Sequence, residues 1–141
     1  MIEKLSLNRD YKMENITETI SKTQELENRL IDFAVLILEI TDNLPSKRSC
    51  NHLGDQLMRS GTSPALNYGE AQFAESRNDF IHKIKICLKE LKESKICITI
   101  IEKRNYVPDS TELLKAKKEV AELVNIFTKS AKTATDNKVK K

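Results

Sequence analysis

Residues 76–103 read SRNDFIHKIKICLKELKESKICITIIEK, and this stretch decides the fold. Its apolar and small side chains recur at alternating steps of four and three residues, at Phe80, Ile84, Cys87, Leu91, Ser94, Ile98 and Ile101. Such a heptad seam predicts a helix that packs along its whole length against other helices. Ser76, with Asp79 three residues later, resembles a capping box and predicts the start of the helix. At about 1.5 Å per residue the helix is roughly 42 Å long, so its partners must also be long.

Two further seams lie before and after this stretch. The first comprises Leu26, Leu30, Phe33, Ile37, Ile40 and Leu44, and the helix that it predicts ends before Pro45. The last comprises Leu113, Ala116, Val120, Leu123 and Phe127. A turn over residues 105–108 precedes this last helix, and either Asp109 or Ser110 caps it.

The composition indicates an all-α protein. The chain of 141 residues contains only 3 Gly and 3 Pro, too few for the many turns of an all-β domain. Hydrophobic residues make up 39% and charged residues 32%, which excludes collagen-like and largely disordered chains.

The remaining segment, residues 47–74, admits two interpretations. Ser60-Gly61-Thr62-Ser63-Pro64 in isolation is typical of a loop, which would divide the segment into two short helices. Alternatively it is one helix that bends at Pro64. With one bent helix here, four helices joined by short turns fold most simply as an antiparallel up-down-up-down four-helix bundle.

We expect three parts along the chain. Residues 1–22 lack sustained periodicity and predict a loose N-terminal arm, residues 23–134 form the bundle, and residues 135–141 form a basic C-terminal tail. The net charge is only +3, yet eight Lys face three acidic residues after position 114. This basic end either contacts nucleic acid or merely keeps the protein in solution.

The first helix carries apolar residues outside its seam. They are Ile31, Val35, Leu36 and Leu38. One bundle buries one stripe of a helix, so these residues predict a second burial partner and hence an oligomer interface.

Polar residues form a stripe on the second helix. Gln56, Arg59, Ser63, Asn67 and Glu70 fall within an arc of about 80° if the helix is continuous. They form a solvated face, or a buried network in which Arg59 and Glu70 neutralise each other along the helix or between subunits, or a catalytic or ligand site. The last interpretation lacks a nucleophile beside a base, because His52 and His82 lie on different helices.

Other site classes have little support in the sequence. Cys50, Cys87 and Cys97 show no metal-ligand spacing and no paired framework, which indicates reduced thiols in the cytoplasm. The longest apolar run, residues 33–38, is far shorter than a membrane span, and no signal peptide is evident. We expect no catalytic residues, no cofactor, no metal and no membrane partner.

Residues 56–71 read QLMRSGTSPALNYGEA and are followed by SRNDF at 76–80. This order resembles the signature of the small four-helix bundle proteins encoded in intervening sequences of bacterial 23S ribosomal RNA genes. The resemblance covers about residues 26–134. It implies a continuous, bent second helix, assembly into a homopentamer, and no enzymatic activity. A related branch, the accessory variability protein of diversity-generating retroelements, is similar in fold and there binds a reverse transcriptase and nucleic acid through a basic surface.

That resemblance directs attention to Lys85, Lys89 and Lys92, which share one face of the third helix. Glu90 and Glu93 border this face and dilute its charge. Repeated around a ring, the lysines would hold a polyanion by counterion release. We therefore expect a non-catalytic oligomeric bundle that binds nucleic acid or a nucleic-acid-processing partner. Among nucleic acids, RNA is the first candidate. The alternative is a structural or protein-protein interaction scaffold that binds no nucleic acid.

Overall fold

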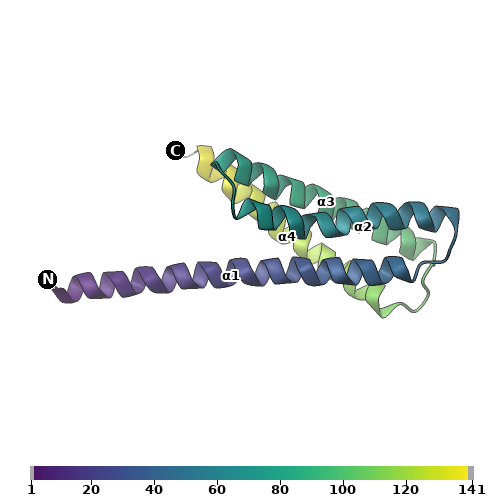
Figure 1. Cartoon of the computed structure of the whole chain (residues 1–141), viewed down its shortest axis with the longest axis horizontal. Coiled ribbons are helices and arrows are strands. Elements are labelled where there is room, and N and C mark those ends of the chain that lie inside the picture. The colour runs from purple at the N-terminus through teal and green to yellow at the C-terminus, as the bar shows by residue number, and fades with distance from the viewer. Residues whose placement is uncertain (1, 140–141) are drawn as a thin grey trace.

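The computed structural model describes residues 2–139 and, within them, the side chains up to residue 137. Four helices follow one another along the chain: α1 (Ile2–Asp42), α2 (Arg48–Ala71), α3 (Arg77–Lys103) and α4 (Thr111–Val139). Each helix packs against the next, and α4 returns to α1, which closes the ring of an antiparallel up-down-up-down bundle (Figure 1). The predicted all-α fold class is confirmed.

The seams supply the core of the bundle. Phe33, Leu91, Leu123 and Phe127 are each at most 1% exposed. Tyr68 of α2 meets Phe127 of α4 edge to face, with ring centroids 5.7 Å apart. The three apolar seams therefore correctly identified the sides of α1, α3 and α4 that turn inward.

Helix α2 is continuous through Pro64, so the alternative with two short helices is wrong. Its glycine at position 61 explains how the helix fits against α1: a Cβ there would lie 2.7 Å from Cγ2 of Ile37. The missing side chain lets the two backbones approach closely. Across α2, the buried Cys87 thiol of α3 donates to the Pro64 carbonyl at 3.5 Å. The bend predicted at Pro64 stays a prediction.

Side-chain caps set two helix starts. Ser76 Oγ accepts the Asp79 amide at 3.1 Å, as its spacing predicted. Ser110 Oγ accepts the Leu113 amide at 3.1 Å, which decides between the two candidate caps of α4. Asp109 instead adopts a left-handed conformation, with φ of 60°, in the preceding turn.

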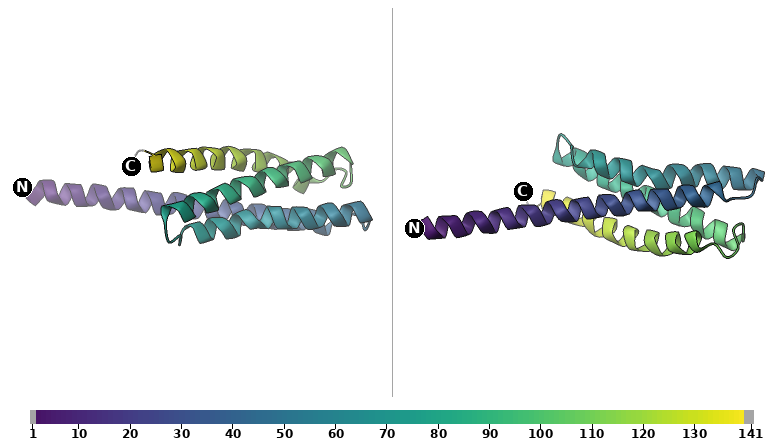
Figure 2. Two further views of the ribbon diagram at one scale, coloured as in Figure 1. Left: turned by 90° about the horizontal axis from the view of Figure 1, so that it is seen from above. Right: turned by 60° about the horizontal axis from the view of Figure 1, so that its bottom comes forward.

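The N-terminal arm is helical, so the expected loose conformation is wrong. Residues 2–22 continue α1 as one helix of 41 residues that projects beyond the bundle (Figures 1 and 2). All of these residues are exposed, which agrees with a bundle that begins near residue 23. The periodicity of this segment is too weak to predict a helix, and no other element of the chain covers it.

The predicted tail begins inside α4. Residues 135–139 continue the helix past Ala134, so α4 does not end where the tail was expected to begin. The lysine side chains at 138, 140 and 141 lie outside the described residues.

Candidate nucleic-acid interface

Lys85, Lys89 and Lys92 lie exposed on the outer face of α3, and we call them the basic band. They follow one another at steps of four and three residues, so their ammonium groups share one side of the helix. The opposite side of the same turns carries Cys87 and Leu91, which are fully buried. Burial of that side is what holds the basic band toward solvent.

Arg59 of α2 binds the two glutamates that border the basic band. Its guanidinium donates to Glu90 Oε2 at 2.9 Å and also contacts Glu93. The carboxylates of Glu90 and then Glu93 raise the pKa of Arg59 above its ordinary value. Since α2 supplies a cation for both acids, the dilution expected from the sequence is reduced.

The other ion pairs of α3 do not involve the lysines of the basic band. Lys83 donates to Glu70 of α2 at 2.6 Å. Glu102 accepts from Lys117 of α4 at 2.9 Å. Helix α3 holds seven Lys and Arg against four Asp and Glu. Three of those four acids are thus engaged by Arg59 or Lys117, and the excess positive charge faces outward.

The polar stripe of α2 is not one buried network within the chain. Its members were Gln56, Arg59, Ser63, Asn67 and Glu70. Arg59 and Glu70 do not pair with each other, and their side chains remain 56% and 61% exposed. Eleven residues separate them, about 16 Å along the helix, whereas α3 brings an oppositely charged group to each. The interpretation as an intrachain network is therefore wrong, and pairing between subunits stays a prediction.

Part of that stripe does interact locally. Asn67 Nδ2 donates to Ser63 Oγ at 2.8 Å and to the Ser63 carbonyl at 3.0 Å. Both side chains are only partly buried, and Gln56 is exposed. The stripe thus combines local hydrogen bonds with ion pairs to α3.

The structure reveals a buried polar contact that sequence reasoning missed. Ser94 Oγ donates to Ser60 Oγ at 2.9 Å, and both residues are fully buried. The signal was present, because Ser94 occupies a seam position of α3 that otherwise carries apolar residues. This contact joins α3 to the turn of α2 that contains Ser60 and Gly61.

The apolar residues outside the α1 seam separate into two groups. Ile31, Val35 and Leu38 are 45%, 49% and 40% exposed on the outer face of α1. Leu36 instead is partly buried and lines a groove of about 440 Å³ between α1 and α4. The exposed group is thus three residues, not four.

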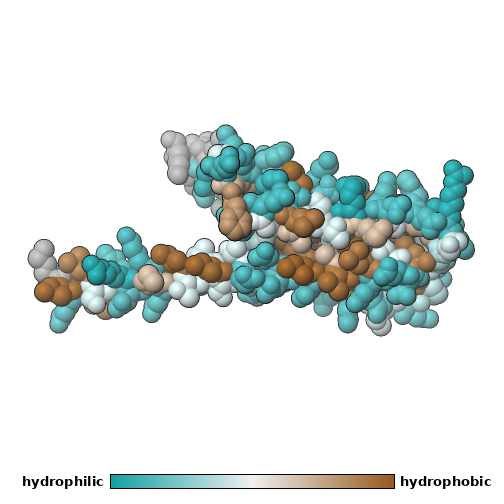
Figure 3. Space-filling model, in the orientation of Figure 1, coloured by the Kyte–Doolittle hydropathy of each residue, from teal (hydrophilic) through white to brown (hydrophobic). Residues whose placement is uncertain are grey.

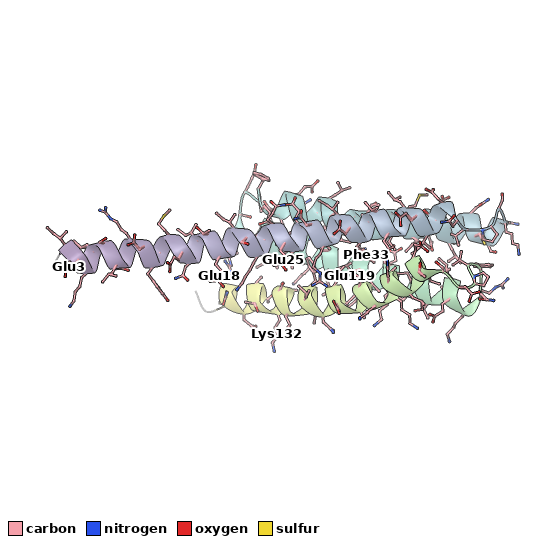
Figure 4. All side chains as sticks on the ribbon, turned by 90° about the horizontal axis from the view of Figure 1, so that it is seen from below. Glu3, Glu18, Glu25, Phe33, Glu119 and Lys132 are labelled. Atoms are coloured by element: carbon pink, nitrogen blue, oxygen red, sulfur yellow. The ribbon has the colours of Figure 1, made fainter. Side chains whose placement is uncertain are left out.

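The groove beside Leu36 is internally neutralised. Arg29 of α1 donates to Glu122 of α4 at 2.8 Å and also binds Glu119. Figure 4 shows Phe33 and Glu119 between the two helices. The remaining charged side chains of the wall are Asp32, Lys115 and Lys118, so the six charged residues that line the groove sum to zero.

The described residues form no cluster suited to metal binding, and their cysteines are buried. Residues 2–139 contain no group of three His, Cys, Asp or Glu side chains that would hold a metal ion. The three cysteines are buried, and burial raises the pKa of the Cys87 thiol to about 12. Over the described chain, no helix combines the length and apolarity of a membrane span.

Comparison with known proteins agrees with this architecture. A family model described as 23S rRNA-intervening sequence protein matches residues 22–129. A search of curated proteins gives no match. A solved structure of a protein of unknown function from the S23 ribosomal protein family of Bacteroides thetaiotaomicron superimposes with a TM-score of 0.70 at 27% identity, covering 79% of this chain and 98% of that one. Since the family model spans most of the bundle, the chain belongs to the family of 23S rRNA-intervening sequence proteins.

Proposed function

We propose that this protein is a non-catalytic, self-associating bundle that binds RNA through the phosphates contacted by its basic band. The observation that carries the proposal is the placement of Arg59, which occupies Glu90 and Glu93 and leaves three exposed lysines beside them. Lysine contacts to phosphate carry no sequence information. The binding is therefore indifferent to RNA sequence.

One chain alone is a weak binder. Lys85 and Lys92 are seven residues apart, about 10 Å along the helix, so the basic band of one chain reaches only a few phosphates. Several copies would multiply the contacts. The exposed Ile31, Val35 and Leu38 support self-association, and the family resemblance implies a homopentamer.

Replacement of Lys85, Lys89 and Lys92 by Gln tests the proposal. We expect weaker retardation of single-stranded RNA and a smaller slope of log affinity against log salt, by about 0.7 for each phosphate that the variant no longer neutralises. The matched control replaces Lys118, Lys129 and Lys132 of α4 by Gln, which removes the same charge from another surface. An equal loss of affinity in both variants, or wild-type protein that binds no RNA at low salt, contradicts the proposal.

A protein scaffold is the second candidate, and one observation favours it. Ile96 and Ile100 follow Lys92 at steps of four residues on the same face of α3 and are 62% and 39% exposed. A mixed basic and apolar surface suits an acidic, amphipathic protein segment. Replacement of both isoleucines by Ser would then abolish partner binding, whereas RNA retention by the basic band would be unchanged.

A further inference from the structure

The arm of α1 presents an apolar stripe that nothing in the chain covers. The stripe consists of Ile2, Leu5, Met13, Ile16 and Ile20, which are each 53% to 85% exposed. These residues share one side of the helix, because they follow steps close to 3.6 residues. Figure 3 shows apolar side chains at intervals along α1, on the arm and on the part that joins the bundle.

The arm needs a partner to be a stable helix. Six residues between positions 2 and 22 are Ser, Thr or Asn, which are weaker helix formers than Ala or Leu. Most helical stability in proteins comes from packing of an apolar face, and residues 2–22 are all exposed. A helical arm of this composition therefore indicates that the stripe is covered in the assembled protein.

The outer face of α1 within the bundle carries the complementary stripe. Its exposed members are Ile31, Val35 and Leu38. Counted forward from Ile2, the stripe positions, with Arg9 among them, advance by 3, 4, 4, 3 and 4 residues to Ile20. Counted backward from Leu38, the positions on the same side step by 3, 4, 4, 3 and 4 residues to Ile20 as well, and they include the polar Glu27 and Gln24. The spacing of these positions is thus symmetric about Ile20. Apolar side chains match at both ends of the pattern and at Ile20, whereas Met13 and Ile16 correspond to Glu27 and Gln24.

We propose that two copies of this chain pair antiparallel along α1, with a two-fold axis at Ile20. In this arrangement the arm of each copy covers the exposed outer face of the other. Ile2 lies opposite Leu38 of the second copy, and Leu5 lies opposite Val35. The contact between residues 2 and 38 is about 54 Å long. A second copy of the chain then buries both uncovered stripes. The same surface is used by both copies, as in an isologous interface.

The charges of the arm favour a second copy over a membrane surface. The arm is neutral, since Glu3, Asp10, Glu14 and Glu18 balance Lys4, Arg9, Lys12 and Lys22. A membrane-bound amphipathic helix instead carries an excess of Lys and Arg on its polar face.

The single charge within the arm stripe also has a place in the pair. Arg9 lies opposite Ile31 of the second copy and diagonal to Glu27, one step further along. An opposite charge at this position offsets the cost of placing a guanidinium in an apolar seam.

The bundle leaves room for this pairing. Leu30, Phe33 and Ile37 face the core on the side of α1 away from Ile31 and Val35. Each bundle therefore sits on the outer side of its own α1, at opposite ends of the pair. The inference extends the proposed self-association and is independent of RNA binding. A ring would have to form through other surfaces, and the arms would then join two rings.

Site-specific crosslinking tests the pairing in the full chain. A sample of Leu5→Cys is mixed with a differently tagged Val35→Cys sample and treated with a short bis-maleimide. We expect a crosslinked heterodimer in the mixture and none from Leu5→Cys alone. Wild type should give none, because Cys50, Cys87 and Cys97 are at most 3% exposed. Crosslinking of Leu5→Cys with itself would show parallel arms and overturn the proposal.

The matched control uses Asn15→Cys with Glu25→Cys. These positions lie at the same level of the antiparallel pair but on the other side of α1, so we expect no crosslink. Equal yields in both mixtures would indicate random collision and count against the pairing. Ile16→Glu with Ile20→Glu should also weaken self-association about 100-fold or more, while Asn15→Glu should leave it unchanged. RNA retardation measured on the same samples separates failure of the pairing from failure of RNA binding.

Discussion

Arg59 of α2 lies 2.9 Å from Glu90 of α3, measured from Nη1 to Oε2. The Glu90 side chain is only 10% exposed, whereas that of Arg59 is 56% exposed. The arginine thus brings a positive charge from the surface to a carboxylate at the edge of the core. This ion pair joins the two most extensively packed helices and occupies an acid beside the basic band.

Removal of Arg59 should destabilise the bundle. Arg59→Ala removes the positive charge that pairs with the Glu90 carboxylate. We therefore expect a lower Tm in thermal unfolding followed by circular dichroism. The double variant with Glu90→Gln should lose less stability than the two single changes added together. Strict additivity would show that the pair does not couple.

Gly61→Ala should destabilise the packing of α1 against α2. A methyl group there would lie 2.7 Å from Ile37 Cγ2, and such overpacking typically costs about 1–3 kcal/mol. Urea denaturation would measure the change.

Gly69→Ala is the matched control in the same helix. A Cβ at Gly69 would meet Glu27 at 3.7 Å, an ordinary contact. Because Ala is a better helix former than Gly, we expect no loss of stability and up to about 1 kcal/mol of gain. Equal destabilisation by both changes would contradict the close approach at Gly61.

Val35→Glu with Leu38→Glu should dissociate the oligomer without unfolding it. Both side chains are exposed in the single chain, so the charges cost little there, but each would be buried unpaired at the interface. Light scattering at micromolar concentration should report a mass below that of the wild type, which equals the chain mass of 16.1 kDa if the α1 pair is the whole assembly. The control, Glu39→Gln, changes an exposed residue of α1 outside the stripe and should keep the assembly. An unchanged mass for the double variant would place the interface elsewhere.

The Cys87 thiol should resist alkylation in the folded protein. Burial raises its pKa from 9.0 to about 12, so the reactive thiolate is scarce at neutral pH. Above pH 9 the unfolded chain loses this proton while the folded chain keeps it, so stability should fall between pH 9 and about pH 12. Cys87→Ala should reduce that slope in urea titrations made across this range. Rapid labelling of native Cys87 by a maleimide at neutral pH would contradict its burial.

Particular residues show how much the sequence predicted. The α3 seam from Ile84 to Ile101 is buried, and Ser76 caps the helix as its spacing indicated. The segment 60–64 was ambiguous, because Gly61 and Pro64 are helix breakers locally. Tertiary packing overrides that preference: Gly61 admits Ile37, and Cys87 contacts the Pro64 carbonyl. The arm at residues 2–22 was interpreted as loose because its apolar stripe is interrupted. The helical periodicity that can be read from its sequence is therefore weak.

The sequence by itself determined the bundle parts of α1, α3 and α4 and their buried sides, because heptad spacing and capping are properties of neighbouring residues along one helix. Only the tertiary structure decided which partner each charged side chain takes. Arg59 had an acid, Glu70, on its own stripe, yet it binds Glu90 and Glu93, and Glu70 binds Lys83. The choice depends on the register and rotation of α2 against α3, which core packing sets and which no single helical pattern contains.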